Sequence, residues 1–121
     1  MKILLIGATG QLGGDILRNN RAHDIEAPDR SVLDLTEPAQ MGEYIRARRP
    51  AAVINCAAFH NVPLCEEQPE QAFRINCVAV RDLAALCREI GAWLVTFSTN
   101  YVFGGDKRTP YIEDDAPAPL Q

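Results

Sequence analysis

Residues 1–14 read MKILLIGATGQLGG, and this stretch decides the expected fold. Its unbroken apolar run, residues 3–6, is typical of a strand that is buried on both faces of a parallel sheet. Gly7, Gly10 and Gly13 follow, and a helical pattern begins behind them. Glycines between a strand and a helix let the backbone approach a pyrophosphate, and the helix N-terminus adds free N–H groups and partial positive charge. The stretch therefore predicts a nucleotide site, although a tight turn without a ligand is an alternative reading.

The composition is typical of a globular protein with one domain. A length of 121 residues allows one modest core, and a formal net charge of -4 argues against a general nucleic-acid binder. No apolar run approaches the roughly 20 residues that a membrane helix needs. The first apolar run is also too short for the core of a signal peptide. We therefore expect a cytoplasmic protein with neither a nucleic-acid nor a membrane partner.

Four cysteines and two histidines are the residues that a zinc site would use. Cys56, Cys65, Cys77 and Cys87 form no C-x-x-C pair. We therefore expect no metal site, and we expect four reduced thiols that act as small apolar side chains.

Strands and helices are expected to alternate along the chain. Strands are predicted at residues 2–6, 23–27, 51–55 and 93–97, and helices at 11–19, 37–49 (with Thr36 as N-cap) and 70–90. Pro63 and Pro69 are expected to bracket an irregular stretch, and the chain is expected to be irregular after Thr99. The last helix is expected to bury one face made of Phe73, Cys77, Val80, Ala84, Cys87 and Ile90.

This alternation predicts an α/β fold, a Rossmann-like doubly wound parallel sheet with helices on both faces. About four strands are present, so the sheet is expected to be incomplete. The basic run Arg46, Arg48 and Arg49 is interpreted as a solvated helix end, with nucleic-acid binding as the alternative.

An acidic residue follows the glycine loop at the distance expected of a dinucleotide site. Asp29 lies about 20 residues past the loop, where a carboxylate accepts hydrogen bonds from an adenosine ribose and favours NAD. Arg30 beside it could instead pair with a 2′-phosphate, which favours NADP. A solvated turn without a ligand is the alternative for both residues.

Further candidates lie at the ends of the other strands, where ligands of such sheets bind. Asp34 could accept a hydrogen bond from an adenine amino group while Leu35 covers the ring, or the two could order a turn and fill the core. Ala57 and Ala58 are small enough for a flat cofactor to lie close to the backbone, or for close packing of a helix. The hydroxyl of Thr99 could polarise a carbonyl, or could bond to the backbone.

Six strings, spread in order over the chain, resemble the extended short-chain dehydrogenase/reductases. They are ILLIGATGQLG (3–13), LDLT (33–36), VINCAAF (53–59), FRINCVAV (73–80), STNYVFGG (98–105) and PYIEDDAPAPL (110–120). Within that family they look most like the branch that reduces a nucleotide-linked 4-keto sugar. The resemblance implies a nucleotide-sugar substrate and either NADP or NAD as the cofactor.

The resemblance also assigns roles to individual residues. It implies a pyrophosphate loop made of Gly7, Thr9, Gly10, Gln11, Leu12 and Gly13, and a ribose site made of Asp29, Arg30 and Ser31. Asp34 and Leu35 would hold adenine, Cys56, Ala57 and Ala58 would line the cofactor, and Asn76 would brace the loops. Thr99 would be a catalytic residue that polarises the substrate carbonyl.

The chain departs from the family pattern in three places. Asn100 stands where the family has aspartate, and Pro63 and Leu64 stand where it has aspartate and lysine. The catalytic pair Y-x-x-x-K is expected beyond Gln121, and neither Tyr101 nor Tyr111 has lysine four positions later. Residues 1–121 are therefore expected to be the N-terminal part of a dinucleotide-binding domain without a substrate lobe, inactive alone and associated with another copy or a partner fragment.

Other functions remain open at this point. A non-catalytic cofactor-binding or regulatory subunit would retain the same loop. So would an epimerase or dehydratase of the same superfamily. A structural or interaction module would have the loop without a ligand.

Overall fold

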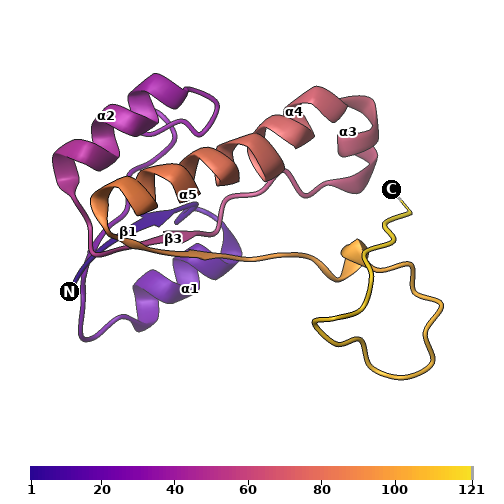
Figure 1. The fold of residues 1–121 in the computed structure, drawn as a ribbon. Helices are drawn as coiled ribbons and strands as arrows, with labels where there is room; N and C mark the ends of the chain where they lie inside the picture. The colour runs from indigo at the N-terminus through magenta and orange to yellow at the C-terminus, as the bar shows by residue number, and fades with distance from the viewer. Residues whose placement is uncertain (121) are drawn as a thin grey trace.

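The computed structural model describes residues 1–120, which form a parallel sheet between two helical layers (Figure 1). The strands are β1 (Lys2–Ile6), β2 (Asp24–Glu26), β3 (Ala52–Asn55) and β4 (Trp93–Thr96), in the spatial order β2-β1-β3-β4. All three pairings are parallel, with Leu4 opposite Val53 and Val53 opposite Leu94. The predicted Rossmann-like α/β fold is confirmed, although β2, β3 and β4 are shorter than expected.

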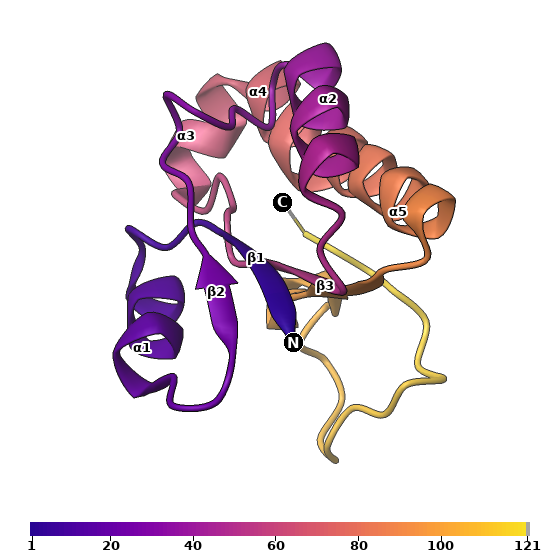
Figure 2. The ribbon, with the colours of Figure 1, turned by 90° about the vertical axis from the view of Figure 1, so that its left-hand side faces the viewer.

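Helices cover both faces of the sheet, as predicted. Figure 2 shows α1 (Gln11–Asn19) on one side and α2 (Pro38–Arg48) with α5 (Ala79–Ile90) on the other. The main core lies between the sheet and the second pair. Its most completely buried side chains are Leu4, Met41, Ile45, Val53 and Leu83.

The stretch between Pro63 and Pro69 is helical, so the expectation of an irregular segment is wrong. Helix α3 spans Val62–Glu67 and α4 spans Pro69–Phe73, and each has its proline in the first turn. A proline there sacrifices no hydrogen bond, because the first N–H groups of a helix have no partner within it. The Asn61 side chain also caps α3 by accepting a 3.0 Å hydrogen bond from the Leu64 N–H.

The long helix expected at residues 70–90 is present, with a π-helical turn inside it. Helix α4 runs into the π turn η1 (Arg74–Val78), and η1 runs into α5. The predicted buried face is wrong at Phe73, which is 68% exposed, and at Cys77 and Ala84, which are also exposed. The core instead receives Ala79, Leu83, Leu86 and Cys87. Two neighbouring stripes of this helix are apolar. The stripe that contains Leu83 and Leu86 is the one that packs on the sheet and on α2.

The N-cap of helix α2 lies one residue later than expected. Glu37, not Thr36, is the N-cap residue, because the Thr36 hydroxyl donates instead to the Asp34 carboxylate at 2.7 Å. Two arginines of the basic run at the other end, Arg46 and Arg48, form ion pairs. Arg46 makes a two-bonded pair with Glu89 of α5 at 2.7 and 2.9 Å, and Arg48 donates to Glu26 of β2 at 2.7 Å. These arginines join α2 to its neighbours rather than forming a free cationic surface.

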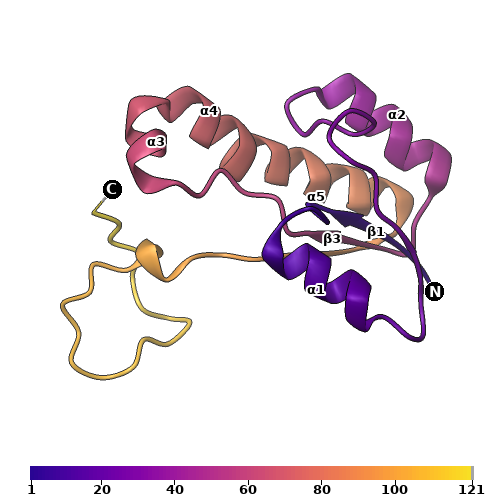
Figure 3. The ribbon, with the colours of Figure 1, turned by 180° about the vertical axis from the view of Figure 1, so that it is seen from behind.

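The chain after β4 leaves the layered body, as Figure 3 shows from behind. One 3-10 turn, η2 (Asn100–Val102), is followed by the irregular segment that the prolines predicted. This segment folds on itself through a stacked pair, Phe103 and Tyr111, whose ring centroids are 4.3 Å apart. Among the described residues, no helix has the length and apolarity that crossing a membrane requires.

Candidate functional site

The glycine turn joins β1 to α1 at the carboxyl end of the sheet. Gly7 has a φ of +82°, and a Cβ placed there would lie 2.6 Å from the Ala57 nitrogen. A Cβ at Gly13 would lie 2.3 Å from the Gly7 carbonyl oxygen. The turn and the packing of α1 against it therefore require glycine at both positions.

Gly10 has no comparable reason within the protein to be glycine. Its φ of −78° is open to any residue, and a Cβ there would meet only the Gly7 oxygen at 3.4 Å, an ordinary contact. Gly10 is also the N-cap of α1, without a side-chain cap, and the first hydrogen bond of the helix runs from Gly14 N–H to the Gly10 carbonyl at 2.9 Å. The earlier N–H groups of α1 thus border space that Gly10 leaves open, which suits a phosphate.

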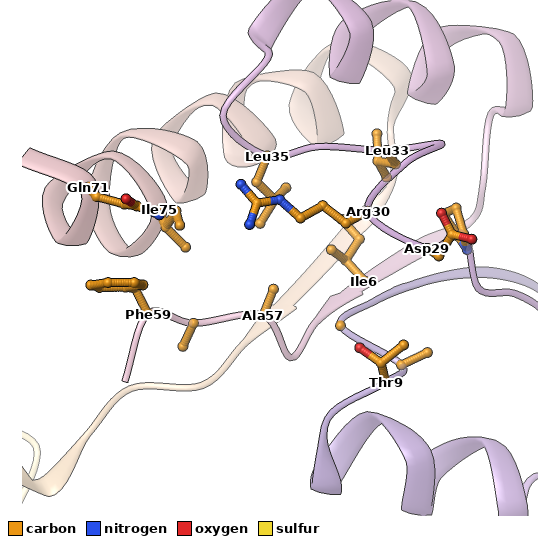
Figure 4. Close-up of a pocket in the computed structure, with 14 residues that line it drawn as sticks. Ile6, Thr9, Asp29, Arg30, Leu33, Leu35, Ala57, Phe59, Gln71 and Ile75 are labelled. Carbon is orange, nitrogen blue, oxygen red and sulfur yellow. The ribbon is translucent and has the colours of Figure 1, made fainter. Parts of the chain in front are cut away.

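A cavity of about 250 Å³ opens beside this turn (Figure 4). Four segments form its wall: the glycine turn, the loop after β2, the loop after β3, and the helix α4 with η1. The lining residues are Ile6, Gly7, Ala8, Thr9, Pro28, Asp29, Arg30, Leu33, Leu35, Ala57, Ala58, Phe59, Gln71 and Ile75.

The cavity collects some of the residues that the sequence singled out and leaves others outside its wall. Gly7, Thr9, Asp29, Arg30, Leu35, Ala57 and Ala58 line it. Gly10, Gln11, Leu12, Gly13, Ser31, Asp34, Cys56 and Asn76 do not. Thr99 lies beyond β4, and its hydroxyl oxygen accepts a 3.2 Å hydrogen bond from the Tyr101 N–H. That contact is the backbone-bonding alternative expected for this hydroxyl.

Asp29 and Arg30 present opposite charges at the cavity. One oxygen of Asp29 accepts from the Ser31 hydroxyl at 2.6 Å, the Ser31 N–H at 2.8 Å and the Val32 N–H at 3.3 Å. The Ser31 hydroxyl, followed by these backbone groups, holds the pKa of Asp29 below its usual value, so the carboxylate is ionised at neutral pH. Arg30 donates from Nε to Asp34 at 3.0 Å, and its remaining nitrogens bond to no side chain or carbonyl of residues 1–120.

The carboxylate of Asp34 orders the turn before α2. One oxygen accepts from the N–H and the hydroxyl of Thr36 at 2.8 and 2.7 Å, and the other accepts from Arg30. Burial raises the pKa of Asp34, but the Thr36 and Arg30 hydrogen bonds outweigh it and leave the pKa lowered. Leu35 next to it belongs to the buried core and also lines the cavity.

Two asparagines hold the loop that forms the cavity floor. Asn76 in η1 accepts from the Phe59 N–H at 2.9 Å and donates to the Phe59 carbonyl at 2.8 Å, which is the brace that the resemblance implied. Asn55, only 2% exposed, accepts from the Ala57 N–H at 3.1 Å. Sequence reasoning missed Asn55, although a polar residue that closes an apolar strand was a visible signal.

Sequence reasoning also missed several residues that line the cavity. Leu33 and Phe59 belong to strings that carried the family resemblance, but no role followed from that. Gln71 and Ile75 are four residues apart on one helix, and this spacing alone does not show that they face the glycine turn. None of the described residues form a cluster of three or more potential metal ligands, and the four cysteines are free. Cys87 is buried in the core as expected, whereas Cys77 is exposed.

Comparison with known proteins identifies the family. The model of the RmlD substrate binding domain family matches residues 1–121. The chain belongs to this family. It is 39% identical over 126 aligned positions to dTDP-4-dehydrorhamnose reductase of Escherichia coli K12, covering 99% of the chain but 42% of that relative.

Solved structures agree with this assignment. The dTDP-4-dehydrorhamnose reductase of Bacillus anthracis, in complex with NADP, superposes with a TM-score of 0.93 at 35% identity, over 98% of this chain and 43% of that one. The orthologue from Clostridium acetobutylicum gives a TM-score of 0.94 at 38% identity, over 98% and 43%. The resemblance to the extended short-chain dehydrogenase/reductases is confirmed. This RmlD-family chain spans about two fifths of the length of the relatives that it matches.

Proposed function

We propose that residues 1–121 form the cofactor-binding part of a nicotinamide-dependent reductase that acts on a nucleotide-linked 4-keto sugar. The relatives named dTDP-4-dehydrorhamnose reductase support a role in dTDP-rhamnose biosynthesis. The observation that carries the proposal is the open space at Gly10, at the N-terminus of α1, beside a cavity lined by Asp29 and Arg30. The matched family is named for substrate binding, whereas these features suit a dinucleotide.

The proposed roles follow from the geometry of the site. The first N–H groups of α1 bind the pyrophosphate, and the missing side chain of Gly10 leaves room for it. The adenosine half enters the cavity, whose 250 Å³ is small for a whole dinucleotide. Asn55 and Asn76 keep the loop after β3 in place beneath it, and the hydroxyl of Thr99 orients the substrate carbonyl. The nicotinamide, when bound, supplies the hydride.

We propose that Arg30 recognises the 2′-phosphate of NADP. Its Nη groups are uncommitted among residues 1–120, while its Nε pairs with Asp34, which fixes the guanidinium. Arg30→Ala is expected to weaken NADP⁺ binding about tenfold and to leave NAD⁺ binding within about twofold, as expected for loss of one charged hydrogen-bonded contact. Calorimetric titration of both cofactors measures the change. An equal loss of affinity for both cofactors would show that Arg30 supports the site without recognising the 2′-phosphate.

The proposed function is tested by titrating the 121-residue chain with NADPH and NADH in a calorimeter. Saturable binding is expected, and the absence of heat with both cofactors would favour a structural or interaction module. Turnover by residues 1–121 alone is not expected, because none of their three tyrosines is followed four positions later by lysine. NADPH oxidation with a dTDP-linked 4-keto sugar would contradict that expectation.

A further inference from the structure

Arg74 joins the π turn η1 to the loop after β2. Its guanidinium donates from Nη2 at 2.6 Å and from Nε at 3.2 Å to the carbonyl oxygen of Thr36, 38 residues earlier in the chain. Among residues 1–120, it is the only side chain from outside residues 28–40 that makes a hydrogen bond to residues 28–36. Arg74 is therefore the polar contact that fixes this loop against the long helix.

A chain of hydrogen bonds runs from Arg74 to Arg30. Thr36, which Arg74 holds at its carbonyl, donates from its N–H at 2.8 Å and from its hydroxyl at 2.7 Å to one oxygen of Asp34. The other oxygen of Asp34 accepts from Nε of Arg30 at 3.0 Å. The direction of the Arg30 guanidinium therefore depends on the place of Thr36, which Arg74 sets.

Asp29 in the same loop does not depend on this chain of hydrogen bonds. Its carboxylate is held within its own turn by Ser31 and Val32. Loss of the Arg74 contact is therefore expected to disturb Arg30 more than the carboxylate that is expected at the ribose.

The two arginines also line a second hollow of about 330 Å³, together with Thr36, Glu70 and Gln71. In Figure 4, the guanidinium of Arg30 points toward the helix that carries Gln71. Direct binding of a phosphate by Arg74 is therefore the competing explanation. The hydrogen bonds favour positioning, because Arg74 uses Nε and Nη2 on the Thr36 carbonyl, whereas the Nη groups of Arg30 are uncommitted among residues 1–120.

We propose that Arg74 positions Arg30 for recognition of the 2′-phosphate of NADP, by holding Thr36 rather than by touching the cofactor. This role rests on the proposed function, which assigns the 2′-phosphate to Arg30. Arg74 is thus a positioning residue. Sequence reasoning missed it because the contact joins segments that are far apart in the chain.

Two neutral substitutions separate positioning from direct binding. In Arg74→Gln, the amide nitrogen lies as many bonds from Cα as Nε of arginine does, so it is able to donate to the Thr36 carbonyl without a charge. Arg74→Met has a side chain of similar length and no donor. Arg88→Met is the matched control, because Arg88 is an exposed arginine of α5 that has no ion pair among residues 1–120 and lines neither hollow.

Calorimetric titration with NADP⁺ and NAD⁺ measures the effect. Arg74→Met is expected to weaken NADP⁺ binding about fivefold and to leave NAD⁺ binding within about twofold, a smaller loss than removal of Arg30 itself. Arg74→Gln and Arg88→Met are expected to stay within about twofold of the wild type for both cofactors. Melting temperatures near that of the wild type are expected, because Leu33 and Leu35 keep the loop in the core.

A double variant shows whether Arg74 acts through Arg30. In the Arg30→Ala background, Arg74→Met is expected to cause no further loss of NADP⁺ affinity, because the group that it positions is already absent. Losses that add in the double variant would contradict action through Arg30.

Three other results overturn the positioning role while the proposed function stands. Equal losses in Arg74→Gln and Arg74→Met would show binding through charge. An equal loss for both cofactors would show a structural role, and wild-type affinities in Arg74→Met would show no role. A wild type that binds neither cofactor overturns the proposed function and the role of Arg74 together.

Discussion

At the scale of single residues, three glycines at the junction of β1 and α1 are glycine for three different reasons. Gly7 adopts a left-handed backbone conformation, and Gly13 allows α1 to pack on the turn. Gly10 leaves space in front of the helix N-terminus. Only the third reason bears on the proposed phosphate site, so substitutions of these glycines are expected to separate binding from stability.

Gly10→Ala is expected to affect cofactor binding, whereas Gly13→Ala is expected to affect stability. Gly10→Ala should leave the melting temperature nearly unchanged and weaken NADP⁺ binding at least about tenfold, because the methyl group occupies the phosphate position. Gly13→Ala should reduce the free energy of unfolding by about 3 kcal/mol or more, because its Cβ meets a backbone oxygen that cannot move away. Thermal melts and calorimetry measure both. Unchanged NADP⁺ affinity in Gly10→Ala would contradict the proposed phosphate position.

The role of Asn76 in holding the loop after β3 can also be tested by substitution. Asn76→Ala leaves the N–H and carbonyl of Phe59 without their partner, and should lower the free energy of unfolding by about 1 kcal/mol, since water replaces part of the contact. Cofactor affinity should also fall, because the loop forms the cavity floor. Asn19→Ala is the control, since Asn19 donates to the Asp15 carbonyl on α1, outside the cavity wall. Wild-type affinity in Asn76→Ala would show that the loop needs no brace.

At the scale of elements, a single carboxylate ties β2 to α2. Glu26 accepts hydrogen bonds from the Tyr44 hydroxyl at 2.6 Å and from Arg48 at 2.7 Å, and it lies 3.7 Å from the Lys2 ammonium of β1. The Tyr44 hydroxyl, and then Arg48, hold the pKa of Glu26 below its usual value of 4.5. Burial, followed by the hydrogen bond to Glu26, raises the pKa of Tyr44, and Arg48 opposes this shift.

This carboxylate makes stability depend on pH. Because the pKa of Glu26 is lower in the folded chain, its contribution is complete above about pH 4.5, the unfolded value, and is lost as the pH falls through the folded value. Glu26→Gln should lower the free energy of unfolding at pH 7 by about 1 kcal/mol and flatten its decline between about pH 5 and 3. Urea unfolding at several pH values measures this. Glu43→Gln, at an exposed position of α2 with no ion pair among residues 1–120, should retain the wild-type slope.

For individual elements, the sequence predicts whether a segment is a helix or a strand better than it predicts which face of that segment is buried. The bounds of β1 and α1 agree with expectation, because an apolar run, a glycine turn and an amphipathic pattern are local signals. The buried face of the continuous helix α4–η1–α5 was predicted wrongly at Phe73, Cys77 and Ala84, because the stripe that contains them and the stripe that contains Leu83 are both apolar. The choice between those stripes depends on the sheet beneath. Helix α3 was missed because prolines mark both the ends of helices and their first turns.

At the scale of the whole molecule, β4 is an edge strand with an uncovered apolar face. It pairs with β3 on one side and with no other strand among residues 1–120. Trp93 and Val95, at alternate positions on one face of β4, are 78% and 45% exposed, and Phe97 directly after the strand is 54% exposed. Exposed edges and contiguous apolar side chains favour association.

The 121-residue chain is therefore expected to associate with a second copy of itself. Light scattering should show a mass above that of the monomer, increasing with concentration. Val95→Lys should shift the population toward monomer, because it places a charge on the apolar face. Val32→Lys is the matched control, at a loop valine that is 46% exposed. A monodisperse monomer at high concentration would contradict the prediction.

The sequence by itself determined the alternation of the four strands with the helices α1, α2 and α5, the parallel sheet and the glycine turn before α1. Each of these depends on residues that are close together in the chain, or on the rule that connects successive parallel strands. Only the tertiary structure decided which stripe of α5 is buried and that Gln71 and Phe59 line the same cavity. Those outcomes depend on contacts between residues far apart in the chain, and the periodicity of one segment carries no information about what packs against it.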